Sequence, residues 1–288
     1  MQYPVYIAAG IALLTLAYAG LILWYRYLWQ RLPAPAAPQV SQPASTSITV
    51  IVPARNEAAN IAACLQSVLG QQYPMALLQL IVVNDASTDD TAEIVAGFMP
   101  RHPNLLCISL PATVQSAHKK RAIQAGIAAA TGNLVVCTDA DCTMRPQWLQ
   151  ALASAHQQGA QFVAAPVMFH TRPTLLSIFQ TLDFISLQGI TGASVSGGFH
   201  TMCNGANIAY TKAAFHQVNG FSGIDLQPTG DDMLLMYKIY RAYPQGLVWL
   251  KSTTATVTTA AAHNWYAFFQ QRIRWASKAA FYQDRRVF

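Results

Sequence analysis

The sequence predicts an α/β fold, a mostly parallel sheet with helices on both faces, preceded by one N-terminal transmembrane helix. From residue 48 onward, short β-rich runs alternate with helical stretches, which is the pattern of parallel sheets. Only 10% of the 288 residues are charged, whereas soluble domains carry about 25%, which argues against an ordinary soluble protein. Hydrophobic residues make up 53% of the chain, and this excludes a disordered protein.

The N-terminal segment has the length and composition of a membrane span. Residues 1–25 carry no charge, and about 20 apolar residues cross a bilayer core. Aromatic residues such as Tyr6 and Trp24 stand near its two ends, as they do at membrane interfaces. The alternative is a cleaved signal peptide, but no basic residue precedes the apolar stretch. Arg26 and Arg31 follow it, which predicts that the body of the protein is cytoplasmic.

Composition divides the chain into four segments. Proline among Ala, Ser and Gln predicts a semi-extended linker after the apolar span. Near the C-terminus, five basic residues stand against one acid between positions 272 and 286. The five cysteines are scattered without a C-x-x-C pair, which suits a reducing compartment. We therefore predict an anchor (1–31), a Pro/Ala-rich linker (32–47), a main α/β domain (48–260) and a basic interfacial helix (261–288).

Strands are expected where aliphatic residues run together and then stop at Pro, Asn or Asp. The first four runs lie at 48–52, 80–83, 105–110 and 134–137. Helices are expected between them at 56–69, 89–98 and 119–130. The later half predicts strands at 161–169 and 247–251, helices at 175–190, 231–243 and 263–288, and a Gly/Ser loop at 192–198. Ligands of such sheets bind beyond the carboxyl ends of the strands.

Nine of the twelve acidic residues fall in four clusters, and most of these clusters follow predicted strands. Asp139 and Asp141 leave the fourth strand one residue apart, so both carboxylates can hold one Mg²⁺ or Mn²⁺ with the oxygens of a diphosphate. A simple turn at a strand end is the alternative. Asp231 and Asp232 precede a helix, where a carboxylate can cap the backbone or deprotonate an acceptor hydroxyl.

Further polar residues could serve a nucleotide. Asp85 and Glu57 follow the second and first strands and could accept hydrogen bonds from a base or ribose, although an acid like Glu57 also suits a helix N-terminus. Lys119, Arg272 and Arg274 could neutralise a diphosphate leaving group, or they could form a membrane-facing basic surface.

Together and in chain order, six short motifs resemble those of family-2 glycosyltransferases with a GT-A (Rossmann-like) fold. The resemblance is to the membrane-integrated branch, which includes cellulose, chitin, hyaluronan and poly-N-acetylglucosamine synthases and ceramide glucosyltransferase. The motifs are V-P-A-R-N-E (52–57), V-N-D-A-S-T-D-D-T (83–91), T-D-A-D (138–141), N-G-A-N (204–207), T-G-D-D (229–232) and Q-R-I-R-W (271–275).

The resemblance implies a role for each matching residue. The residues that would bind the nucleotide sugar are Pro53, Glu57, Asp85, Lys119, Asp139 and Arg274. Asp141, with Asp139, would hold Mg²⁺ or Mn²⁺ on the diphosphate. Asp232 would be the general base, with Asp231 second. The residues that would bind the acceptor are Asn207, Gln271 and Trp275, with Trp275 as a stacking platform.

The expected function is therefore a membrane-anchored, inverting hexosyltransferase of the inner cell membrane, with its catalytic domain in the cytoplasm. The donor is expected to be UDP-glucose or UDP-N-acetylglucosamine, and the acceptor a hydroxyl of a polysaccharide or a lipid. Nucleic acid is not an expected partner. The alternative function is a non-catalytic membrane subunit that binds nucleotide sugars. Relatives in this branch usually continue into further transmembrane helices, whereas this chain ends thirteen residues after Trp275, at position 288, so it is either a fragment or a single-span form.

Overall fold

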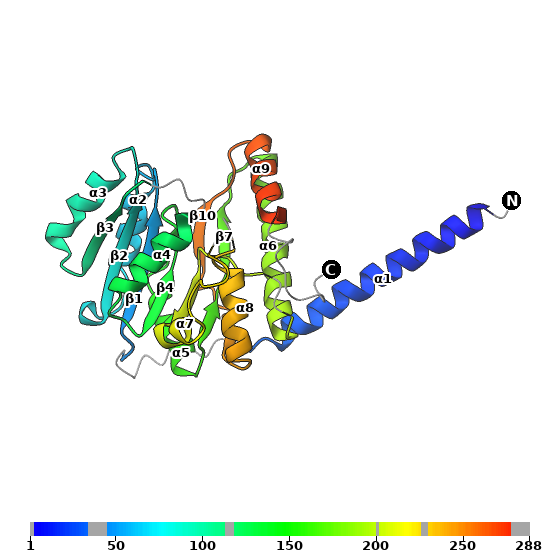
Figure 1. Cartoon of the computed structure of the whole chain (residues 1–288). Helices are drawn as coiled ribbons and strands as arrows, with labels where there is room; N and C mark the ends of the chain where they lie inside the picture. Colours follow the sequence, from blue (N-terminus) through cyan, green and yellow to red (C-terminus); the bar gives the residue numbers. More distant parts are fainter. Residues whose placement is uncertain (1–2, 34–44, 113–117, 200–201, 226–229, 278–288) are drawn as a thin grey trace.

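The computed structural model describes residues 3–33, 45–112, 118–199, 202–225 and 230–277. A long N-terminal helix, α1 (Tyr3–Arg31), projects from an α/β body (Figure 1). Within the described residues, α1 is the one helix long and apolar enough to cross a membrane, with a mean hydropathy of 2.1. N-terminal signal sequences share these two properties.

The body is built around a seven-stranded sheet with the order β3-β2-β1-β4-β8-β6-β9. The strands are β1 (Ile48–Ala54), β2 (Leu78–Asp85), β3 (Leu105–Leu110), β4 (Leu134–Cys137), β6 (Phe162–Ala164), β8 (Ile208–Thr211) and β9 (Leu247–Trp249). The four strands from β3 to β4 are mutually parallel, β8 runs antiparallel to both of its neighbours, and β6 and β9 are parallel. The predicted, mostly parallel α/β fold is therefore confirmed.

Helices cover both faces of this sheet, and the strand sequences show why. In β1, Val50 and Val52 pack into one core cluster while Ile51 packs into the other, and all three are fully buried. Strands buried on both faces are continuously apolar rather than alternating. Helices α2 (Ile61–Leu69), α3 (Thr91–Phe98) and α5 (Trp148–Gln157) line the first cluster, and α4 (His118–Ala129), α7 (Lys212–Gln217) and α8 (Met233–Ala242) line the second.

A second, three-stranded sheet and two further helices complete the body. The small sheet has the order β5 (Thr143–Met144), β10 (Val257–Ala260), β7 (Val167–His170). Helices α6 (Leu175–Ser196) and α9 (Trp265–Ala276) lie beside it, on the side of the body from which α1 leaves (Figure 1). Short 3₁₀ turns occur at Met75–Leu77 and Met99–Arg101.

Two predictions for the later half were wrong. The strand expected over 161–169 is divided into β6 and β7, which belong to different sheets and are separated at Pro166, a residue without an N–H for a ladder. The Gly/Ser loop expected over 192–198 is helical as far as Ser196. Gly192 has a packing role there, because a Cβ would lie 2.7 Å from the rings of both Trp29 and Trp249.

The last turns of α1 are part of the folded body. The ring of Trp24 lies 4.9 Å from that of Phe199, just beyond α6, and Leu28 is only 7% exposed. Lys251 donates a hydrogen bond of 3.2 Å to the Trp29 carbonyl and places its ammonium 4.6 Å from the centre of the Trp29 ring. The helix is therefore fixed to α6 and to the end of β9 rather than joined only through the chain.

Candidate active site

The carboxyl ends of the parallel strands bring the predicted site residues to one edge of the sheet. The register aligns Pro53 of β1 with Val83 of β2, two residues before Asp85, and aligns Ile51 with Cys137 of β4, two residues before Asp139. The expected gathering of polar residues at this edge therefore follows from the topology.

Asp85 is held by two arginines. It is 4% exposed, and its carboxylate lies 2.7 Å from Nη2 of Arg121 and 3.5 Å from Nη1 of Arg55. The same Nη2 of Arg121 also donates to the Pro111 carbonyl at 2.7 Å, which further fixes the guanidinium. The carboxylate predicted to bind the base is thus oriented by charge-assisted bonds from α4 and from the loop after β1.

Glu57 lies in a loop that is bound to the loop after β2. Asn56 adopts a left-handed conformation, with φ 57°, and its side chain accepts from the Thr88 N–H at 2.8 Å. The Glu57 N–H donates to the Thr91 hydroxyl at 2.8 Å, and its carboxylate accepts from Asn60. Burial raises the pKa of Glu57, and the charges of Asp141, Asp139 and Asp89 raise it further, while the bond from Asn60 lowers it.

This raised pKa gives a testable prediction for Glu57→Gln. The folded protein holds the Glu57 proton more tightly than the unfolded chain, so the stabilisation is complete below pH 4.5 and is lost as the pH rises through the folded-state pKa. The variant is therefore expected to unfold up to about 2 °C higher than wild type at pH 7, with no difference at acidic pH. The measurement is a pair of thermal unfolding curves, with exposed Glu93→Gln as control; a lower midpoint at pH 7 would contradict the account.

Lys119 joins the two acidic motifs across the site. Its Nζ lies 2.6 Å from Oδ1 of Asp139 and 3.7 Å from Oδ2 of Asp231. Burial alone would lower the pKa of Lys119, but the charges of Asp139, Asp231 and Asp232 together hold it well above its ordinary value. The lysine is therefore protonated, and it fixes the spacing between the end of β4 and the segment before α8.

The chemistry of the Asp139 and Asp141 carboxylates fits a hard divalent cation. Asp139 is half-buried, and Asp141 accepts a 2.9 Å hydrogen bond from Thr259 of β10 through Oδ2. Mg²⁺ is commonly held by one or two carboxylates together with substrate phosphates. Across the described ranges, no three His, Cys, Asp or Glu side chains gather as a metal cage, so such an ion would complete its shell with diphosphate and water oxygens.

Asp232 caps α8 and contacts the N-G-A-N loop. Its Oδ1 accepts from the Met233 N–H at 2.7 Å and its Oδ2 accepts from the Gly205 N–H at 3.2 Å. A Cβ at Gly205 would lie 3.1 Å from Nζ of Lys119 and 3.3 Å from Cβ of Asp232, so a larger residue would make a tight contact with both side chains. The carboxylate is 5% exposed and is oriented by two backbone donors.

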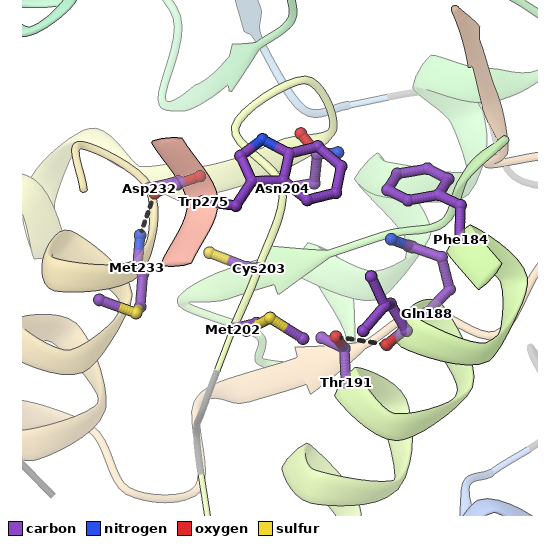
Figure 2. A pocket seen from close by; sticks show the side chains of 10 residues that line it. Phe184, Gln188, Thr191, Met202, Cys203, Asn204, Asp232, Met233 and Trp275 are labelled. Carbon is purple, nitrogen blue, oxygen red and sulfur yellow. Dashed lines mark hydrogen bonds between the residues drawn. The ribbon is translucent and has the colours of Figure 1, made fainter. Parts of the chain in front are cut away.

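A cavity opens beside Asp232 and has mostly apolar walls (Figure 2). Phe184, Gln188 and Thr191 of α6 line one side of it, and the ring of Trp275 of α9 lies between Asp232 and Phe184 in this view (Figure 2). Asn204 and Cys203 also line it. Asp232 and Trp275 therefore line the same cavity. The predicted roles of general base and acceptor platform need the two side chains to be close in this way.

The other predicted acceptor residues lie differently. Asn207 is completely buried, and its side chain accepts from Trp148 Nε1 at 2.9 Å and donates to the carbonyls of Pro166 and Ala255 at 2.7 and 2.8 Å. Gln271 is half-buried on α9, whereas Arg274 is exposed; neither lines the cavity beside Asp232. The Q-R-I-R-W helix thus brings Trp275, but not Arg274, to that cavity.

Asn207→Ala is expected to destabilise the fold, because it leaves the buried Trp148 N–H and the buried Ala255 carbonyl without their partner and removes one of the two hydrogen bonds to the Pro166 carbonyl. The expected loss is about 3 kcal/mol in the free energy of unfolding, measured by denaturant titration. Asn204→Ala is the matched control, since Asn204 lines the cavity and is expected to change stability little. Unchanged stability with lost sugar transfer in Asn207→Ala would contradict this structural role and support the predicted role of Asn207 in acceptor binding.

Comparison with known proteins places the chain in a family. The family model "Glycosyl transferase family 2" matches residues 49–218, which is more than half of the chain, and the chain belongs to this family. The probable glycosyltransferase YdaM of Bacillus subtilis is 24% identical over 239 residues, covering 80% of this chain and 54% of YdaM. Poly-beta-1,6-N-acetyl-D-glucosamine synthase of Staphylococcus epidermidis is 25% identical over 241 residues, covering 80% and 53%. The chain spans about half the length of these relatives.

Solved structures share the GT-A fold. The mannosyltransferase PcManGT of Pyrobaculum calidifontis, in complex with GDP-Man and Mn²⁺, superposes with a TM-score of 0.70 at 24% identity, covering 96% of this chain and 76% of that one. S. aureus TarS in complex with UDP-GlcNAc gives a TM-score of 0.58 at 19% identity, covering 77% and 60%. Both structures contain a nucleotide sugar.

Proposed function

We propose that the chain transfers a sugar from a nucleotide sugar to a hydroxyl acceptor, with inversion at the anomeric carbon and Asp232 as general base. The observation that carries the proposal is the cavity shared by Asp232 and Trp275, together with the ion pairs by which Lys119 joins Asp231, the neighbour of Asp232, to the Asp139 carboxylate. These contacts support a site in which Asp232 is the base, Trp275 the aromatic platform and Asp139 part of the diphosphate site.

The donor side uses the edge of the parallel strands. Pro53, Glu57 and Asp85 would bind the nucleoside, and Lys119 and Arg274 the diphosphate. Asp139 and Asp141 would hold Mg²⁺ or Mn²⁺, which supplies charge neutralisation for the leaving diphosphate when bound. The proposed donors are UDP-glucose and UDP-N-acetylglucosamine, and the UDP-GlcNAc bound in TarS supports this choice. PcManGT binds GDP-Man instead, so GDP-mannose is the donor to compare them with.

The acceptor side uses the cavity. Asp232 takes the proton of the acceptor hydroxyl, the hydroxyl oxygen forms a bond to the anomeric carbon, and the bond from that carbon to the diphosphate breaks. Lys119 is charged and adjacent, so it balances negative charge that develops on the diphosphate. Trp275 presents a face on which a sugar ring can stack, and Asn204 offers a polar group on the same cavity.

We also propose that α1 is a membrane anchor and that α9 lies at the membrane surface, with the catalytic domain on the cytoplasmic side. The burial of the α1 end against α6 supports an anchor that belongs to the folded protein.

Helices α6 and α9 share an exposed apolar surface, where the rings of Phe179 and Trp265 lie 5.8 Å apart. Its side chains are 45% to 80% exposed: Leu175, Ile178, Phe179, Leu182, Ile185, Trp265, Tyr266, Phe269 and Ile273. Such a surface suits polysaccharide or lipid acceptors handled beside a bilayer.

The test is release of nucleoside diphosphate by the membrane-bound protein from UDP-glucose, UDP-N-acetylglucosamine and GDP-mannose, with Mn²⁺ or Mg²⁺. Release from one UDP-sugar that stops on adding EDTA is expected. Release that is insensitive to EDTA would contradict the proposed metal site, and a preference for GDP-mannose would contradict the proposed donor.

A further inference from the structure

Helix α9 is held against α6 by polar contacts at two places. Before its start, the side chain of Gln180 donates to the Ala262 carbonyl at 2.9 Å and accepts from the Ala262 N–H at 3.0 Å. Further along, the guanidinium of Arg272 forms an ion pair with the carboxylate of Asp183. Gln180 and Asp183 are three residues apart and therefore neighbours on one side of α6. Both the beginning and the middle of α9 are thus positioned by the same helix.

Arg272 also stacks on two aromatic rings of its own helix. Its guanidinium carbon lies 4.5 Å from the centre of the Trp275 ring and 4.9 Å from that of Phe268. Spacings of three and four residues place these side chains on one face of α9. A guanidinium that stacks on a ring and pairs with a carboxylate restrains both, in a way that a flexible ammonium does not.

The ring restrained by Arg272 is the one that faces the cavity. Trp275 lines that cavity together with Asp232, and its ring lies 5.7 Å from the ring of Phe184 (Figure 2). Phe184 follows Asp183 directly in α6. The same turn of α6 therefore supplies the counter-ion of Arg272 and the ring beside Trp275.

We propose that Arg272, fixed by Asp183, is a positioning residue that sets the Trp275 ring over the acceptor side of the cavity. The proposal rests on the proposed function, in which Trp275 stacks on the acceptor. The ion pair holds the Arg272 guanidinium against α6, and the guanidinium in turn holds the Trp275 indole by stacking on it.

This role differs from the neutralisation of a diphosphate suggested by the basic sequence. The charge of Arg272 is matched by Asp183 at the interface of α6 and α9, and its side chain is only 21% exposed. Burial lowers the pKa of Arg272 and the charge of Asp183 opposes that shift, while an arginine remains protonated at neutral pH. A positioning role affects transfer to the acceptor, whereas diphosphate neutralisation affects every reaction of the donor.

The first test is ¹⁹F NMR of the full chain labelled with 5-fluorotryptophan, with the Trp275 resonance assigned by Trp275→Phe. Arg272→Ala and Asp183→Asn are each expected to shift or broaden the Trp275 resonance and to leave in place the resonances of Trp148 and Trp249, which do not line the cavity. Arg272→Lys keeps the charge but not the planar stacking and is expected to give an intermediate shift. Exposed Arg101→Ala is the matched control. An unmoved Trp275 resonance in Arg272→Ala, or equal movement of all resonances, would overturn the proposal.

The second test separates donor reaction from transfer. With the UDP-sugar that the wild type uses, Arg272→Ala is expected to lower incorporation of labelled sugar into the native membrane fraction about tenfold, with unchanged KM for the donor and unchanged release of sugar to water. Equal losses in transfer and in release to water would show that Arg272 acts on the donor and would overturn the positioning role. Wild-type protein without either reaction would contradict the proposed function instead, and the NMR result would still decide the position of Trp275.

Discussion

Replacing Asp232 with asparagine is expected to reduce sugar transfer by about 10²–10⁴-fold, the usual contribution of a general base. Asparagine has the shape of aspartate and retains an oxygen for the Met233 N–H that caps α8, although it loses the longer bond from the Gly205 N–H, so folding and donor binding are expected to persist. It cannot accept the proton of the acceptor hydroxyl. The measurement is transfer of labelled sugar, beside UDP binding by calorimetry.

Asp231→Asn is the matched control for this prediction. Asp231 lies 3.7 Å from Nζ of Lys119 and does not line the cavity, so its loss is expected to weaken charge balance near the diphosphate more than proton transfer. Full transfer in Asp232→Asn with loss in Asp231→Asn would move the general base to Asp231.

Asp141→Asn is expected to reduce metal-dependent turnover by about 10²–10³-fold, because a bound divalent ion contributes several kcal/mol of charge stabilisation. The amide oxygen of asparagine can still accept from Thr259, so the loop between β4 and β5 is expected to keep its conformation. Binding of Mn²⁺ in the presence of UDP, followed by electron paramagnetic resonance, is expected to weaken in parallel with turnover.

Thr259→Val tests how much of the effect of Asp141→Asn comes from losing the carboxylate itself and how much from losing its orientation. This variant removes the hydroxyl that donates to Asp141 but leaves the charge in place. We expect a reduction of about tenfold, which is the lower end of the range for the loss of an outer-sphere hydrogen bond to a metal ligand. A Thr259→Val variant as inactive as Asp141→Asn would contradict the assignment of Asp141 as the metal-binding carboxylate.

The first half of the fold could be predicted closely because its strands carry unambiguous signals. The strand expected over 105–110 is β3, and the one over 134–137 is β4, since each is an apolar run bounded by polar residues. The region after Gln161 was harder, because β6 and β7 are separated by only two residues and together form one mostly apolar run in the sequence. The division between β6 and β7, and the antiparallel insertion of β8, depend on tertiary pairing.

The sequence could predict those parts of the candidate site whose position follows from the order and direction of the strands. Asp85 and Asp139 come together because the carboxyl ends of adjacent parallel strands lie side by side. Asn207 shows the limit: a motif specifies its position along the chain but not the side of the backbone to which its amide points, and it points into the core. Asp183 was a lone acid in an apolar helix, and its pairing with a residue 89 positions later has no local signal.

The most direct test of the central claim is the simultaneous measurement of free UDP and of sugar-labelled product from a single donor, in wild type and in Asp232→Asn. If Asp232 is the base of a glycosyltransferase, free UDP in the wild type is expected to equal the labelled product plus the sugar released to water. The labelled product is expected to be lost in the variant, which still binds UDP. Binding of the nucleotide sugar by the wild type without either product would contradict the account and identify the chain as a non-catalytic binding subunit.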